Sequence, residues 1–287
     1  GHTLFLLSNG TAVSASLFKS LPYDTLADFA PVSTLGFFDI AVLVPADSPY
    51  RTLAQLQPRP ATAGVGYGHG FLPFLKAEPT DVPVNKRHLD MVMAHITLSD
   101  RPFMGSVTAP ERSEDSIEMC RLLFGTDFVD QNCVILGNVN VNSPLVWDGT
   151  MTNSLRAYAR ANQAAVIVPF ILGGAMGPVT IAGGIAQSLA ETMAGCALTQ
   201  LERPGAPVIF GNFLSSMSLR SGSPTFGTPE PAIGSMVIGQ LARRLNLPLR
   251  CSGNFTTSKL PDAQSMMEGT MSMLAAIHCG ANFILHS

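Results

Sequence analysis

The sequence carries little charge. Only 13% of its 287 residues are Asp, Glu, Lys or Arg, the formal net charge is −3, and basic residues do not cluster anywhere. Because binding to a phosphate backbone requires clustered Lys and Arg, this composition argues against a nucleic-acid-binding protein. Hydrophobic residues make up 46% of the chain, a fraction that excludes disorder and is typical of buried parallel strands covered by helices.

Two common functional motifs are missing. The five cysteines never lie within three residues of one another, which excludes a local Cys-x-x-Cys zinc or redox site. We therefore expect buried thiols, a reducing cytoplasmic environment and no directly bound metal. Residues 64–70 alternate glycine with other residues but lack the G-x-G-x-x-G spacing of a dinucleotide loop, which favours a linker over a phosphate-binding loop.

The chain also lacks an uninterrupted membrane span. Its longest uncharged run, residues 161–190, is long enough to cross a bilayer, but Pro169, Pro178 and several glycines interrupt it. We predict a buried strand, a glycine-rich loop and the start of a helix there. The first residues, Gly1, His2 and Thr3, form no basic segment, so we expect no secretory signal and no membrane association.

What is present is a change of composition near residues 58–83, which are rich in proline and glycine. This change predicts an N-terminal add-on segment with its linker over residues 1–76 and a main domain over residues 77–287. We expect residues 1–56 to pack against the main domain without contributing a strand to its sheet.

The main domain alternates short apolar strands with longer helices. A capping box, Thr108 with Glu111, is expected to start one helix, Gly125 to end it, and Thr228 with Pro229 to start another. Apolar residues four apart predict the buried faces of two helices: Ile181, Ile185, Leu189, Met193, Ala197 and Leu201, and then Ile233, Val237, Leu241 and Leu245. Strands are predicted at residues 101–107, 133–141, 164–172, 207–214, 248–251 and 282–287, and helices at residues 108–124, 154–162, 178–201, 228–245 and 261–279.

Strict alternation predicts a parallel sheet of class α/β. Two architectures remain, an open doubly wound sheet and a (β/α) TIM-type barrel. The long polar loops after the strands favour the barrel, because barrel enzymes carry their chemistry on these loops. Six units do not close a barrel of eight, so the barrel is expected to be incomplete in this chain.

Candidate substrate-binding residues are those that follow strands, at the end where barrel sites lie. Asn138, Asn140 and Asn142 alternate and so share one face of their strand, either toward a ligand or as internally bonded strand-end amides. Each of the others has a structural alternative too: surface hydroxyl for Ser215, helix-dipole partner for Glu230, exposed ion pair with Asp262 for Lys259, and core histidine for His286. The predicted set is Asn140, Asn142, Ser215, Glu230, Lys259 and His286, and no catalytic residue is assigned.

Seven stretches of the main domain, taken in order, closely resemble the trimethylamine methyltransferase family, including its glycine betaine methyltransferase members. The resemblance covers roughly residues 78–287. The stretches are VPVNKRHLD (82–90), HITLSDRPFMGSV (95–107), NVNVNSP (138–144), GGAMGPVT (173–180), GSPTFGTPEP (222–231), SKLPDAQ (258–264) and GANFILH (280–286).

The resemblance implies an enzyme that moves a methyl group from a methylated amine to the Co(I) of a corrinoid (cobalamin) carried by a separate corrinoid protein. It implies a quaternary amine as donor, since pyrrolysine, which orients methylamine in relatives, is not written in this sequence. It leaves assembly into a homo-oligomer open.

The N-terminal segment resembles something different, an extracytoplasmic solute-binding protein of the tripartite tricarboxylate transport type. Two further functions therefore stay open: a periplasmic solute-binding protein for a small carboxylate, and an inactive barrel fragment. The similar stretches are HTL (2–4), SNGT (8–11), LPYD (21–24), DFAPVS (28–33) and TLAQL (52–56).

Overall fold

The computed structural model describes residues 83–98 and 102–285. The expected N-terminal add-on (1–76) and His286 lie outside these residues, and the division at residue 77 stays a prediction. The elements in chain order are α2 (Arg87–Leu98), α3 (Pro110–Phe124), α4 (Thr126–Gln131), β1 (Leu136–Val141), α5 (Gly149–Arg160), β2 (Ala164–Gly173), α6 (Ile181–Glu202), β3 (Val208–Gly211), β4 (Phe213–Met217), β5 (Pro224–Thr225), α7 (Pro229–Arg244), β6 (Leu249–Cys251), α8 (Ala263–His278) and β7 (Phe283–Ile284).

The strands form one sheet in which spatial order follows chain order. β1 pairs with β2, β2 with β3 and β4, β3 with β6, and β6 with β7, all in parallel. On the other side of β1, Met104 forms a parallel bridge to Leu136, so the expected strand at 101–107 is reduced to a single bridge. A doubly wound sheet would reverse its order at a switch point. The described sheet has no reversal, and its order is consistent with a TIM-like α/β fold.

β3 and β4 are two halves of one strand. Ala165 pairs with Val208 and Phe170 pairs with Phe213, so both halves keep the same offset from β2. The break between them falls at Asn212, level with Pro169, and proline has no backbone N–H to donate to a neighbouring strand. A short hairpin follows, in which β5 pairs antiparallel with β4, a departure from the expected strict alternation.

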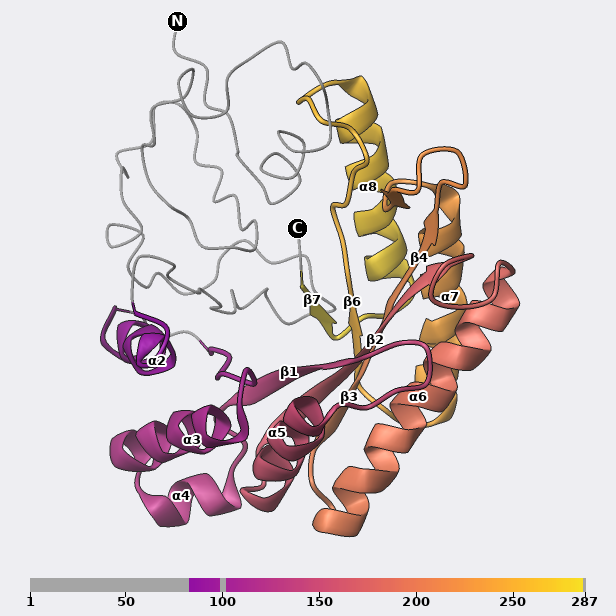
Figure 1. Cartoon of the computed structure of the whole chain (residues 1–287). Coiled ribbons are helices and arrows are strands. Elements are labelled where there is room, and N and C mark those ends of the chain that lie inside the picture. Colours follow the sequence, from indigo (N-terminus) through magenta and orange to yellow (C-terminus); the bar gives the residue numbers. More distant parts are fainter. Residues whose placement is uncertain (1–82, 99–101, 286–287) are drawn as a thin grey trace, which may run out of the picture.

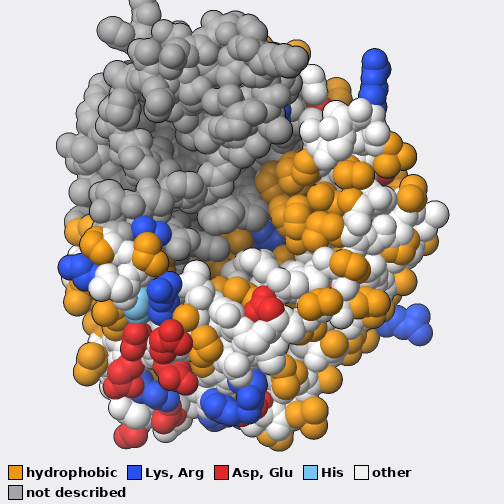
Figure 2. All heavy atoms as spheres, in the orientation of Figure 1, with side chains coloured by type: hydrophobic (Ala, Val, Ile, Leu, Met, Phe, Trp, Pro, Cys, Tyr) orange, Lys and Arg blue, Asp and Glu red, His pale blue; other side chains and the backbone are white. Residues whose placement is uncertain are grey.

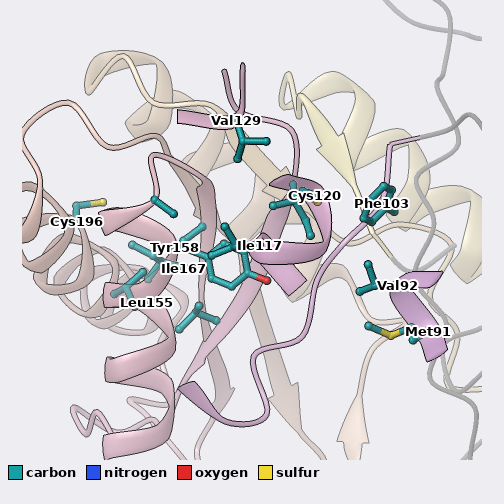
Figure 3. Packing of buried hydrophobic residues seen from close by; sticks show 14 of the residues in the cluster. Met91, Val92, Phe103, Ile117, Cys120, Val129, Leu155, Tyr158, Ile167 and Cys196 are labelled. Carbon is teal, nitrogen blue, oxygen red and sulfur yellow. The ribbon is translucent and has the colours of Figure 1, made fainter. Parts of the chain in front are cut away.

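The two faces of the sheet pack differently. Successive strand residues point to opposite faces, and Val139, Ile167 and Phe210 pack with residues of the helices. In Figure 1 helices α5, α6 and α7 follow one side of the strands. Figure 3 shows Ile167 of the sheet beside Leu155 and Tyr158 of α5 in this core. The opposite face buries a separate group: Met104, Leu136, Ala164, Val166, Val168 and Leu285.

Helix starts were predicted only in part. Thr108 does not cap α3, because the N-cap is Ala109 and the Thr108 hydroxyl contacts Ser106 and the Arg112 guanidinium instead. Thr228 is the N-cap of α7, but its side chain makes no capping hydrogen bond. The expected Gly125 stop is confirmed. Side-chain caps do occur on α5, α6 and α8, where Asp148, Thr180 and Asp262 accept a backbone N–H.

The predicted apolar stripes on α6 and α7 were right only in part: Ile181, Leu189 and Leu241 pack partly buried against the core, but most of the other stripe residues do not. Of the six stripe residues on α6, only Ile185 is buried, and Leu201 is 83% exposed. A strict spacing of four advances about 40° around an α-helix at each step, so a long stripe of this kind drifts off the core. The α7 stripe fails for another reason. Its buried face is built from small residues, and an added Cβ at Gly234 would meet Leu214 at 2.8 Å. The buried residues of α7 are Gly234, Ser235, Ile238, Gly239 and Ala242.

The uncharged run at residues 161–190 folds as predicted into β2, a turn and the first part of α6. Among the described helices, none combines the length and apolar character needed to cross a bilayer.

Candidate functional site

The carboxyl ends of the parallel strands gather the loops that follow them at one edge of the sheet. Asn140 lies on β1 and Asn142 just beyond it, both exposed. Asn138 lies two residues earlier, is buried, and donates its Nδ2 to Asn140 Oδ1 at 3.2 Å. The alternation predicted for these amides is present, and the strand turns Asn138 and Asn140 toward the face opposite the helix-covered core.

Three other candidates lie around β4, α7 and α8. Ser215 is buried and donates its hydroxyl to the carbonyl oxygen of Thr225 at 3.0 Å, within the β4–β5 hairpin. Glu230 is exposed in the first turn of α7, and Lys259 is exposed in the loop before α8. The ion pair considered for Lys259 does not form with Asp262, whose carboxylate caps α8 and accepts from Ser258.

The register separates the candidates into two groups. Asn140 is level with Val168 of β2, whereas Ser215 is level with Leu172, four positions later along the same strand. At about 3.3 Å per residue this is roughly 13 Å along the strands, and β1 and β4 flank β2 on opposite sides. A molecule as small as a methylated amine cannot touch Asn140 and Ser215 together. His286 lies outside the described residues.

Phenylalanines from β2, β4 and the loops that follow β5 and β6 form a cluster. Phe213 packs against Phe170, Phe226 and Phe255, with ring centroids 4.7, 5.9 and 5.6 Å away. Phe226 and Phe255 are themselves 5.2 Å apart. Figure 2 shows hydrophobic side chains gathered in the region where β4, β6 and α8 lie in Figure 1, whereas charged side chains gather over α3 and α4. Four partly buried aromatic rings are therefore gathered in this part of the sheet.

One cation is already part of the cluster. Arg250 lies between Leu249 and Cys251, which both pack on the helix side, so its own side chain points to the opposite face. Its guanidinium sits 5.5 Å from the centre of the Phe213 ring and donates to the Asn212 carbonyl at 3.0 Å. Burial lowers the pKa of Arg250 to about 10, so the group stays charged at neutral pH.

A small cavity lies against the same rings, lined in part by Phe213, Phe226, Phe255 and Ser252. Its volume of about 20 Å³ suits a single water, since one water needs roughly 10–15 Å³. The Ser252 hydroxyl is buried there without a hydrogen-bond partner among the described residues. The cavity is too small for a trimethylammonium group.

Glu191 of α6 holds the loop that follows β1. Its carboxylate accepts from the Ser143 hydroxyl at 2.6 Å, from the Leu145 backbone N–H at 2.8 Å and from Gln187 Nε2 at 2.9 Å. Gln187 also donates to the Met176 carbonyl in the loop after β2. One turn of α6 therefore fixes the loops that follow β1 and β2. Glu191 does this from a buried position, since it is only 2% exposed.

Glu268 of α8 plays the same part for the loop that follows β6. It accepts from the Thr257 backbone N–H at 2.6 Å, the Thr256 hydroxyl at 2.9 Å and Gln264 at 2.8 Å. Desolvation acts to raise the pKa of Glu268, but these hydrogen bonds outweigh it and the pKa is lowered. A Cβ at Gly227 would overlap the Glu268 carboxylate, which explains a glycine there.

Sequence reasoning missed both glutamates and the phenylalanine cluster. A signal existed: Glu268 is the only carboxylate in α8, and Glu191 is the only charged residue of α6 before its last residue, Glu202. Charged residues are rarely buried unless they are paired or hydrogen-bonded, so a lone carboxylate in an apolar helix indicates a structural or functional anchor. Among the described residues no group of three or more His, Cys, Asp or Glu side chains could hold a metal ion.

Comparisons with known proteins place the chain among methyltransferases. The family model described as "Trimethylamine methyltransferase (MTTB)" matches residues 71–287. A glycine betaine methyltransferase of Desulfitobacterium hafniense (strain Y51) is 41% identical over 212 residues, which cover 74% of this chain and 44% of the relative. A trimethylamine methyltransferase of Methanosarcina barkeri is 33% identical over 126 residues, covering 44% of this chain and 26% of the relative. The chain thus spans less than half the length of these curated relatives.

Proposed function

The chain belongs to the trimethylamine methyltransferase family, and on this premise we propose that it transfers a methyl group from a quaternary amine, with glycine betaine as the first candidate, to the Co(I) of a corrinoid protein. We further propose that its parallel strands are part of a (β/α) barrel whose site lies at their carboxyl ends. The observation that carries the donor assignment is the 41% identity to a glycine betaine methyltransferase over most of this chain.

The reaction requires little acid or base chemistry from the protein. The reduced corrinoid supplies the nucleophile, the C–N bond breaks, and its electron pair stays on nitrogen, so a neutral tertiary amine leaves as the methyl group passes to cobalt. No proton moves in this step. What the chain must do is bind the cation, keep water away from it and hold one N–CH₃ bond in line with the acceptor.

The phenylalanine cluster supports the binding step. A quaternary ammonium is attracted to the faces of aromatic rings, by roughly 1–2 kcal/mol when it is desolvated. Arg250 already occupies one face of Phe213, so Phe226 is the ring that we assign to the ligand. The anchored loops support the positioning step, because Glu191 and Glu268 fix the strand-end loops from behind without facing the ligand.

The cysteines support a reducing compartment, and we propose the cytoplasm. All five are free, and four of them are buried. The sulfurs of Cys251 and Cys279 lie 3.6 Å apart without forming a bond. Neighbouring thiols persist in this state where the surroundings keep them reduced.

The test is methyl transfer by the full chain to a cognate corrinoid protein reduced to Co(I). Methylation of cobalt is followed by its absorption spectrum and product formation by mass spectrometry, with glycine betaine and trimethylamine compared as donors. We expect betaine turnover, and Phe226→Leu should raise the KM for betaine about tenfold. Phe128→Leu, which removes an exposed ring of α4, is the control.

Two results would count against the proposal. Turnover of trimethylamine without betaine would overturn the donor assignment. Turnover of neither amine, with the chain folded and the corrinoid protein active toward another methyltransferase, would overturn methyl transfer by this chain.

A further inference from the structure

Two cysteines meet where β6 and α8 end. Cys251 is the last residue of β6, and Cys279, 28 positions later along the chain, is the C-cap of α8. Their sulfur atoms lie 3.6 Å apart, both thiols are free, and the two residues are 0% and 1% exposed. Because a disulfide bond is about 2.05 Å long, the sulfurs need to approach by only about 1.5 Å to form one.

Three elements hold the two cysteines beside one another. Cys251 is fixed in the sheet, where it pairs with Ile284 of β7. On the other side, Arg243 of α7 donates to the Cys279 carbonyl oxygen. The α7 backbone also approaches Cys279 closely, since a Cβ added at Gly239 would meet the Cβ of Cys279 at 2.9 Å. The thiols therefore stay within reach of each other as long as β6, α7 and α8 remain packed.

The two thiols differ in how easily they ionise. The hydrogen bond with Cys251 lowers the pKa of Cys279 against the effect of burial, and the charge of Arg243 acts in the same direction. The same pairing and burial raise the pKa of Cys251. Since the thiolate is the nucleophilic form of cysteine, Cys279 is the sulfur that reacts first.

A space for a small oxidant lies close to the pair. Asn212 donates Nδ2 to the Ser235 hydroxyl at 3.0 Å and to the Cys251 sulfur at 3.8 Å. Both Asn212 and Ser235 line the water-sized cavity beside the phenylalanine cluster. Hydrogen peroxide is little larger than water, whereas an oxidant such as oxidised glutathione is far too large for this space. Peroxide is therefore the oxidant that suits these buried thiols.

We propose that Cys251 and Cys279 are a modification site, at which hydrogen peroxide forms a reversible disulfide. The Cys279 thiolate attacks one peroxide oxygen and the O–O bond breaks. Hydroxide leaves with the electron pair and takes up the proton that Cys279 released, so one water and a sulfenic acid form. The Cys251 thiol then displaces the sulfenic hydroxyl, and its proton leaves with that group as a second water. Two thiols are oxidised and one peroxide is reduced.

The disulfide would join the two ends of the segment that carries the loop after β6. Within this segment the Phe255 backbone N–H donates to the Ser272 hydroxyl, and the Thr257 N–H donates to the Glu268 carboxylate. Both bonds tie the loop to α8. A covalent link across a segment of this length restricts the unfolded chain and so stabilises the folded one. Oxidation is therefore expected to hold the loop more firmly on α8.

The test uses the full chain with Cys133→Ser, because Cys133 is the exposed cysteine and could link two chains. The reduced chain is treated with hydrogen peroxide, digested without reductant and analysed by mass spectrometry. We expect Cys251 linked to Cys279, about tenfold faster than any oxidation of Cys120 or Cys196. Dithiothreitol should reverse the link, and oxidised glutathione should form it far more slowly.

Two further measurements report on the folded chain. The melting temperature of the oxidised chain should rise by roughly 5 °C. Amide hydrogen exchange at Phe255 and Thr257 should become slower, with no change at Val134 and Ile135 at the other end of the sheet.

Serine variants separate this pair from the other thiols. Cys251→Ser and Cys279→Ser should each abolish the link and the rise in melting temperature. Cys196→Ser is the matched control, since it removes another buried thiol and should behave as the parent chain does. Circular dichroism confirms the fold of each variant. Sulfinic acids at Cys251 and Cys279 without a link, linkage of either to another cysteine, or a link that forms only in urea would overturn the proposal.

Discussion

The two ends of the parallel strands are held together by different chemistry. At the amino end, Gln163 is fully buried and bonds to five backbone groups: it accepts from the N–H of Val134 and Ile135, and Nε2 donates to the carbonyls of Val129, Asn132 and Ala161. At the carboxyl end, the loops are held by two buried carboxylates, Glu191 and Glu268.

This difference matches a division of labour. A neutral amide that meets only backbone groups carries no charge toward a ligand and does not titrate, so it serves folding. A carboxylate on a covering helix can hold a loop by its backbone and hydroxyls while the rest of that loop faces outward. In barrels the amino end is associated with stability and the carboxyl end with chemistry, and for the barrel proposed above we expect the anchors of this chain to follow the same division.

The largest expected effect comes from removing the amide at the amino end. Gln163→Leu leaves five buried backbone groups without their partner, and we expect the free energy of unfolding to fall by roughly 4 kcal/mol. Urea unfolding followed by circular dichroism measures this. Ligand binding per folded molecule should not change, because no cavity wall includes Gln163.

Gln200→Leu is the matched control for this prediction. Gln200 also bonds to backbone, at Gly205 and Ala206, but it is exposed and its partners can turn to water. We expect a loss below about 1 kcal/mol. Equal losses in the two variants would contradict the role assigned to the amino end.

The sequence predicted the main alternation of strands and helices, but it missed α2, α4 and β5, and not all of the predicted boundaries were right. β2 was predicted at residues 164–172 and spans Ala164–Gly173. The prediction was good here because a short, continuous apolar run bounded by turn residues is typical of a buried parallel strand. β1 was predicted from residue 133 and begins at Leu136, because Gln163, which is distant in sequence, takes the N–H groups of Val134 and Ile135.

The site was less predictable than the fold. The position of Asn142 and Lys259 after strands could be predicted, since parallel strands carry their following loops at one edge. The separation of Asn140 from Ser215 depends on the register of three strands, which no local pattern encodes. The phenylalanine cluster brings together single residues from β2, β4 and two loops. No sequence motif surrounds any of these phenylalanines, so only the fold shows that they meet.

The second prediction concerns a substitution at the carboxyl end of the strands. Glu191→Gln keeps the size of the side chain but turns an NH₂ group toward the donors of Ser143, Leu145 or Gln187, and we expect a loss of roughly 2 kcal/mol. Hydrogen exchange should show faster opening at Leu145 with no change at Val134 and Ile135. Glu118→Gln, on the exposed face of α3, is the control. Faster exchange at both ends in equal measure would mean that the two ends form one cooperative unit and that the comparison fails.

The smallest expected effect is on how stability depends on pH. Glu268, at the carboxyl end of the strands, can titrate, whereas Gln163, at the amino end, cannot. The pKa of Glu268 is lowered in the folded chain, since hydrogen bonds from Thr257, Gln264 and Thr256 favour the ionised form against desolvation. A carboxyl whose folded pKa lies below its unfolded value stabilises the fold fully above the unfolded pKa, about 4.5 here, and loses this contribution as the pH falls through the folded value.

Glu268→Gln should therefore lose roughly 1 kcal/mol at pH 7, and the gap to the parent chain should stay constant down to about pH 4.5 and shrink below it. Urea unfolding at steps between pH 7 and pH 3 measures the gap. Glu202 and Asp262 also have lowered pKa values, the first through Arg156 and Arg160 and the second through its helix cap, but both remain in the variant and cancel in the difference.

In the Gln163→Leu chain the gap to the parent should not depend on pH across the same range, because an amide has no proton to gain. A gap for Glu268→Gln that holds constant to pH 3 would show that the carboxylate is replaceable by an amide, and the contrast between a neutral end and a charged end would then rest on Glu191 alone.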